Sequence, residues 1–138
     1  MPYPEELCTP MREELTVAGF EELKSANDVE NAIPASKGTV LLLFNSVCGC
    51  AAGSARPGVK MAIQNDKKPT KLFTVFAGQD VEATNKAREF TMPYPPSSPS
   101  VALFKDGNLV HFIERHHIEG RSAQMISENL VEAFNEFC

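Results

Sequence analysis

The chain has 138 residues, 43% of them hydrophobic and 22% charged, a balance typical of a globular protein, so we predict a single domain over residues 1–138. The net charge of −5 argues against a nucleic-acid partner. The longest apolar run, Val40–Phe44, is too short to cross a membrane, and the first residues lack the basic and apolar regions of a secretory signal. We therefore expect a cytoplasmic protein without nucleic-acid or membrane partners. Its four cysteines would stay reduced and serve catalysis, metal binding or packing.

Capping residues predict where several helices begin. Thr9 followed by Pro10 is typical of an N-cap and the first turn of a helix, which Gly19 would end. Ser25, with an acid three residues later, predicts a second helix that runs to about Ala35. The other segments predicted in this way are a short strand at 20–23, a helix over 81–90 capped by Asp80, and a last helix that starts at Ser122.

Two apolar runs, 39–45 and 71–77, predict strands buried on both faces, as in a parallel sheet. Between them the residues from Cys48 onward have helical spacing, with a kink or break near Pro57. A proline-rich loop then leads to a hairpin over 100–114, whose central Asp-Gly pair is a strong turn signal. The predicted fold is α/β, with a parallel βαβ core and antiparallel hairpin strands in one mixed sheet.

The segment "FNSVCGCAAG" places Cys48 and Cys50 where a buried strand passes into a helix. Helix starts present free N–H groups and a partial positive charge, which stabilise a thiolate and lower a cysteine pKa. A thiolate is both a nucleophile and a metal ligand, so this position predicts reactivity of either kind. Gly49 would let the backbone bend and approach a partner closely.

A strand that ends at paired cysteines, followed later by a proline, a hairpin and a last helix, resembles the thioredoxin fold, a three-layer α/β arrangement. The segment "SPSVALFKDGNLV" (98–110) is similar to the thioredoxin segment whose cis-proline faces the active cysteines. This likeness implies that Pro99 is the cis-proline, that Ser98 is the residue before it, and that Pro57 lies near the proline that kinks the active-site helix.

Five blocks together, "NSVCGCAAG", "ARP", "VFAGQD", "PPSSPS" and "HHIEG", resemble the bacilliredoxins over nearly the whole chain. The resemblance implies removal of bacillithiol from S-bacillithiolated client proteins, with weak disulfide isomerase activity. Cys48 would attack the mixed disulfide, and either Cys50 or a second bacillithiol would resolve the adduct. It also implies bacillithiol as thiol co-substrate, no tightly bound cofactor, and recycling by a disulfide reductase or a low-molecular thiol.

The chain departs from thioredoxin at two positions that bear on chemistry. One residue instead of two separates the cysteines, so a Cys48–Cys50 disulfide should be strained, labile and more oxidising. Leu42 stands where thioredoxins keep a buried acid. Bacillithiol is anionic, so its site should offer N–H groups or cations, and Arg56, about two turns along the helix, is the candidate cation.

Two other functions remain open at this stage. The protein could be a general disulfide isomerase that acts on clients without bacillithiol. It could instead be a metal-binding module in which His116 or His117, with Cys8 or Cys138, completes a site with the CxC pair, although the usual C-x₂-C spacing is missing. We expect no metal, interpret Cys8 and Cys138 as incidental thiols, and assign no chemical role to the "HHIEG" block.

Overall fold

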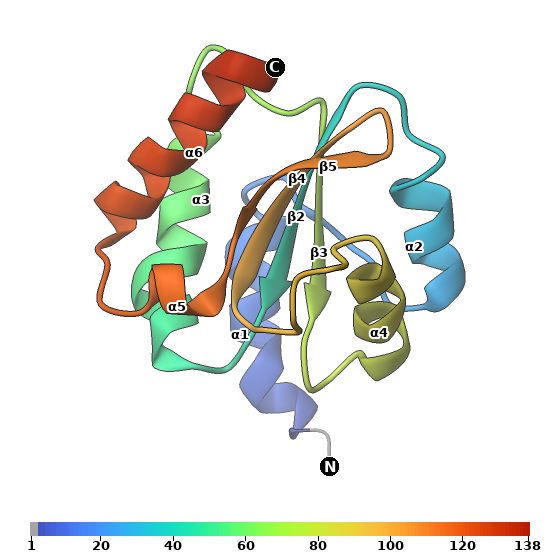
Figure 1. The fold of residues 1–138 in the computed structure, drawn as a ribbon. Helices are drawn as coiled ribbons and strands as arrows, with labels where there is room; N and C mark the ends of the chain where they lie inside the picture. Colours follow the sequence, from blue (N-terminus) through green and yellow to red (C-terminus); the bar gives the residue numbers. More distant parts are fainter. Residues whose placement is uncertain (1–2) are drawn as a thin grey trace.

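A five-stranded mixed sheet forms the centre of the computed structural model, which describes residues 3–138, and helices cover both faces (Figure 1). The strands are β1 (Glu21–Glu22), β2 (Thr39–Asn45), β3 (Lys71–Phe76), β4 (Ser100–Lys105) and β5 (Asn108–Ile113). The helices are α1 (Glu5–Thr16), α2 (Ala26–Ala32), the π-helix η1 (Ala51–Ala55), α3 (Arg56–Ala62), α4 (Val81–Glu89), α5 (Arg115–Ile118) and α6 (Ala123–Phe137). No helix in this part of the chain is long and apolar enough to span a membrane.

The sheet has the order β1-β3-β2-β4-β5. β3 pairs in parallel with both β1 and β2, whereas β4 is antiparallel to β2 and β5. The predicted parallel βαβ core is therefore β2–α3–β3, and the predicted hairpin is β4–β5. Its register pairs Val101 with Ile113, so the end of β5 lies beside the start of β4.

Two hydrophobic clusters separate the sheet from the helices and confirm the predicted three layers. Leu41 and Leu43 of β2 face the cluster that includes α1, α3 and α6, and Leu42 and Phe44 face the cluster with α2 and α4. All seven residues of β2 are buried, as its unbroken apolar run predicts. Each such leucine or phenylalanine contributes roughly 1.5–3 kcal/mol on burial.

Several predicted boundaries are confirmed by their local geometry. The hydroxyls of Ser25 and Ser122 accept the expected capping bonds at the starts of α2 and α6. The hairpin turn has positive φ at Asp106 (49°) and at Gly107 (83°), the combination that an Asp-Gly turn allows. α2, however, ends at Ala32 rather than near Ala35.

The prediction for the first helix is wrong at its start. α1 begins at Glu5, so Thr9 is not its N-cap and Pro10 lies inside it. The reason is tertiary: Arg12 binds Glu5 at 3.0 Å and the Asp80 carboxylate at 2.7 Å, which anchors the early turn against the loop after β3. Asp80 precedes α4 as predicted, but its carboxylate accepts a hydrogen bond from Arg12 and makes no capping bond.

Candidate active site at the Cys48–Cys50 junction

Backbone hydrogen bonds hold Cys48 at the point where β2 passes into η1. Its N–H donates to the Ser46 hydroxyl at 3.0 Å, and its carbonyl accepts from the N–H groups of Ala51 and Ala52 at 3.0 and 3.3 Å. The helix starts with a π-turn because Pro57 has no N–H for the usual i−4 bond, and the ladder shifts by one residue before it. The predicted irregularity near Pro57 thus takes the form of a π-helix.

The surroundings of Cys48 favour its thiolate. The Cys50 thiol donates a hydrogen bond to it, which is the largest cause of a lowered Cys48 pKa. The Cys50 N–H, 3.4 Å from the Cys48 Sγ, the charge of Arg115 and the Ala51 N–H lower the pKa further, against the effect of partial burial. These groups favour the thiolate form at Cys48, the form of a cysteine that reacts as a nucleophile.

Cys50 has the opposite tendency. Burial raises the pKa of its thiol, and donation to Cys48 together with repulsion from the Cys48 thiolate raises it further. The two sulfurs therefore differ, because the surroundings of Cys48 favour its thiolate while those of Cys50 favour its protonated thiol. Both are free thiols here.

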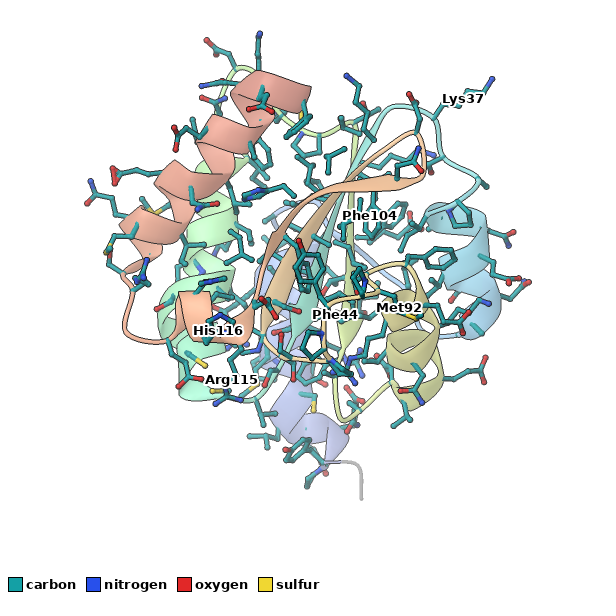
Figure 2. The ribbon with its side chains drawn as sticks, in the orientation of Figure 1. Lys37, Phe44, Met92, Phe104, Arg115 and His116 are labelled. Carbon is teal, nitrogen blue, oxygen red and sulfur yellow. The ribbon has the colours of Figure 1, made fainter. Side chains whose placement is uncertain are left out.

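Arg115, at the start of α5, provides the cation of this site (Figure 2). Its Nη2 donates to the Cys48 Sγ at 3.2 Å, its Nη1 donates to the Ser98 carbonyl at 3.1 Å, and its Nε donates to Glu119 at 2.7 Å. Sequence reasoning gave this residue no role at the site, although it directly precedes the "HHIEG" block. Counting along the hairpin from its Asp-Gly turn would have brought residues 114–115 level with Pro99, and so beside the cysteines.

Ser98 and Pro99 lie as the resemblance implied. The peptide bond between them is cis, Pro99 is buried, and Arg115 links the Ser98 carbonyl to the Cys48 sulfur. The Ser97 hydroxyl also accepts from the Arg115 N–H at 3.4 Å. The proline loop, α5 and the cysteine turn therefore meet around one guanidinium group.

Arg56 has a different role from the one proposed for it. Its side chain is 2% exposed, and its guanidinium donates to Asn45 Oδ1 at 2.8 Å, to the Ser46 carbonyl at 2.9 Å and to Glu14. Helical spacing placed it near the site but could not show which way it points. Arg56 braces the turn between β2 and Cys48 from inside the protein, so it supports the site without offering its charge to a ligand.

Gly49 does not need glycine's left-handed freedom, since its φ lies outside the positive range. A Cβ at this position would meet no described atom within 4 Å. The bend at this turn therefore does not require a positive φ at Gly49, and the close approach to a partner stays a prediction. The open space next to Gly49 leaves room for a partner beside both sulfurs.

The metal site predicted as an alternative does not form around the cysteines. Within residues 3–138, the one group of three or more ligand side chains close enough to share an ion is Glu114, His116 and His117, without Cys48 or Cys50. Cys8 is buried in α1 and Cys138 is exposed at the end of α6.

Several solved structures similar to this one are thioredoxins. The thioredoxin of Fasciola hepatica matches with a TM-score of 0.61 and 21% identity, over 86% of this chain and 100% of that chain. Mitochondrial thioredoxin 3 of Saccharomyces cerevisiae matches with a TM-score of 0.58 and 17% identity, over 85% and 94%. The fold is thus that of thioredoxin, and the chain falls in the class of thioredoxin-fold proteins with a cysteine pair at the start of a helix.

Sequence comparison narrows the class to a family. The family model described as "Disulphide isomerase" matches residues 3–138. A bacilliredoxin of Cytophaga hutchinsonii is 60% identical over 97% of this chain and 98% of its own, and one of Halalkalibacterium halodurans is 51% identical over 99% and 94%. The chain belongs to this family, whose curated relatives carry the name bacilliredoxin.

Proposed function

We propose that this protein removes bacillithiol from S-bacillithiolated client proteins, with Cys48 as the nucleophile. The observation that carries the proposal is the contact between the Arg115 guanidinium and the Cys48 sulfur at 3.2 Å, next to the hydrogen bond from Cys50. These groups stabilise a thiolate on a half-buried residue that a mixed disulfide can reach. The proposal places the protein in a reducing, cytoplasmic compartment.

The reaction consists of two thiol–disulfide exchanges. In the first, the Cys48 thiolate attacks the bacillithiol sulfur of the mixed disulfide, a Cys48–bacillithiol bond forms, and the client thiolate leaves with the proton that Cys50 gives up. In the second, the Cys50 thiolate attacks the Cys48 sulfur, which releases bacillithiol as its thiolate and leaves a Cys48–Cys50 disulfide. Alternatively, a second bacillithiol thiolate attacks the bacillithiol sulfur, which gives bacillithiol disulfide and the free Cys48 thiolate.

Arg115 also suits the charge of this substrate. Its side chain is 43% exposed, so it can contact a ligand while it contacts the sulfur. Bacillithiol carries a malate group, and a guanidinium is the side chain best matched to carboxylates. Arg115 takes the role that the sequence suggested for Arg56. Reduction of the Cys48–Cys50 disulfide by a low-molecular thiol or a disulfide reductase would restore the starting state.

Intact mass after exposure to oxidised bacillithiol, together with the rate of bacillithiol release from a modified client, tests the proposal. We expect an adduct on wild-type protein, none on Cys48→Ala at the CxC pair, and loss of nearly all client release in that variant. Cys50→Ala should retain the adduct and accumulate it. Cys138→Ala, which removes an exposed thiol at the end of the chain, is the matched control. Release at the wild-type rate by Cys48→Ala would contradict the mechanism.

A second candidate, general disulfide isomerisation of client proteins, is favoured by the description of the matching family model. It uses the same nucleophile but needs no bacillithiol. Reactivation of a client with scrambled disulfides, measured beside bacillithiol release under the same conditions, separates the two. Isomerase turnover that exceeds bacillithiol release would make isomerisation the main activity.

A further inference from the structure

A second group of reactive side chains lies on α5 and the residue before it, apart from the two cysteines. Glu114, His116 and His117 each offer one ligand atom, and these atoms all lie within 4.8 Å of one another. The His116 Nε2 is 3.9 Å from the Glu114 Oε2, and the two imidazole rings lie 4.0 Å apart between centroids. Two imidazoles and a carboxylate thus lie close together. Among the described residues, no arginine or lysine forms an ion pair with the Glu114 carboxylate.

We propose that Glu114, His116 and His117 form a binding site for a divalent transition-metal ion, with Zn²⁺ as the best match. Two histidines and one glutamate form a known zinc ligand set, with the fourth position open to water or an external ligand. Bonds of about 2.0–2.2 Å to zinc need ligand atoms about 3.3–3.5 Å apart, so modest side-chain rotation closes the present spacing. This inference does not depend on the proposed function.

The exposure of the two imidazole rings supports this closure. The side chain of His116, which Figure 2 labels on α5, is 69% exposed. His117 is also exposed, so both rings can turn without disturbing the core. The Glu114 side chain is only 15% exposed, so it offers a better-fixed carboxylate around which the rings can close. A bound ion would fix the same short segment that presents Arg115 to Cys48.

The test must separate this site from the thiols, which bind zinc themselves. We would titrate Zn²⁺ into Cys48→Ala/Cys50→Ala/Cys138→Ala protein by calorimetry at neutral pH, and record the absorption spectrum of its Co²⁺ complex. We expect one equivalent of bound zinc and a cobalt spectrum with visible bands but no near-ultraviolet thiolate charge transfer. Adding His116→Ala or Glu114→Gln should weaken binding at least tenfold.

Two matched controls should leave zinc binding unchanged. His111→Ala removes a histidine that is bound instead to Asn129 at 2.7 Å, and Glu119→Gln removes the other acidic charge beside Arg115. Circular dichroism should show that every variant is folded. The proposal is overturned if the thiol-depleted protein binds no stoichiometric zinc, if His116→Ala binds it equally well, or if the cobalt spectrum shows thiolate ligation.

Discussion

Cys8 in α1 and Cys48 before η1 each lie near one arginine, yet their environments shift their pKa values in opposite directions. Cys8 is 0% exposed and burial raises the pKa of its thiol. Cys48 is partly exposed, and hydrogen bonds from Cys50 with the charge of Arg115 lower its pKa. Hydrogen-bond donors aimed at the sulfur, more than a position on a helix, therefore distinguish a reactive thiol from a packed one.

The arginines beside the two thiols explain part of this contrast. Arg12, in the helix of Cys8, binds three carboxylates, those of Asp80, Glu22 and Glu5. Its charge is already balanced within the protein. Arg115 binds the carboxylate of Glu119 and directs a second nitrogen at the Cys48 sulfur. An arginine with one acidic partner can still act on a thiolate.

The largest expected effect is a difference in alkylation rate between Cys48 and Cys8. At neutral pH and with limiting iodoacetamide, Cys48 should react about 1,000-fold faster, because its pKa is lowered and its side chain is accessible, while the buried Cys8 reacts only after local opening. Peptide mass mapping of timed samples measures both rates. In denaturant the two rates should converge. If Cys48 and Cys8 are alkylated at comparable rates in the folded protein, then α1 opens freely and the surroundings of the two thiols do not set their reactivity.

The second prediction tests whether Arg56 supports the structure rather than the ligand. Arg56→Met should lower the free energy of unfolding by about 2–4 kcal/mol, because the Asn45 amide oxygen and the Ser46 carbonyl lose their donor. Arg121→Met, which removes an exposed arginine, should stay within about 0.5 kcal/mol of wild type. Urea denaturation with excess reductant measures both. If Arg56→Met loses no more stability than Arg121→Met, Arg56 does not stabilise the turn before Cys48.

These residues also show how far sequence reasoning reached. Local signals placed β2, the hairpin and the serine caps, since an unbroken apolar run, an Asp-Gly turn and a capping hydroxyl act over a few residues. The start of α1 was wrong because contacts of Arg12 with Asp80, far along the chain, decide it. Tertiary contacts of this kind leave no local pattern.

The candidate site divides in the same way. Cys48, Cys50 and Pro99 could be found from spacing and from resemblance to thioredoxin. The position of Arg115 beside the cysteines depends on the β4–β5 register, and the burial of Arg56 depends on which side of its helix faces the core. Neither arginine's role could therefore be assigned without the structure. The grouping of Glu114, His116 and His117 also became visible only in the structure, because the segment could not be recognised as helical from its sequence pattern.

The third prediction concerns Arg115 itself. Arg115→Gln should raise the Cys48 pKa toward the usual value and slow alkylation at neutral pH about three- to tenfold, a modest effect because the guanidinium is partly exposed. The pH profile of alkylation measures the pKa directly. Arg121→Gln removes the same charge from an exposed position nearby and should leave the profile unchanged. If both variants shift it equally, net charge rather than the contact controls Cys48.

The smallest expected effect is a difference between Cys8 and Cys48 in how each changes the free energy of unfolding with pH. The raised pKa of Cys8 keeps it protonated in the folded state while the unfolded thiol ionises near pH 8.5, so its stabilising contribution is full below that pH and declines as pH rises. Cys48, with a lowered pKa, contributes in the opposite sense: its stabilisation is present above the unfolded value and is lost as pH falls. Between pH 8 and 9.5, the stability difference between wild type and Cys8→Ala should shrink by about 1 kcal/mol or less, and that between wild type and Cys48→Ala should grow. Denaturation of the reduced proteins across this range measures both slopes, and slopes of the same sign would show that the two environments do not oppose each other.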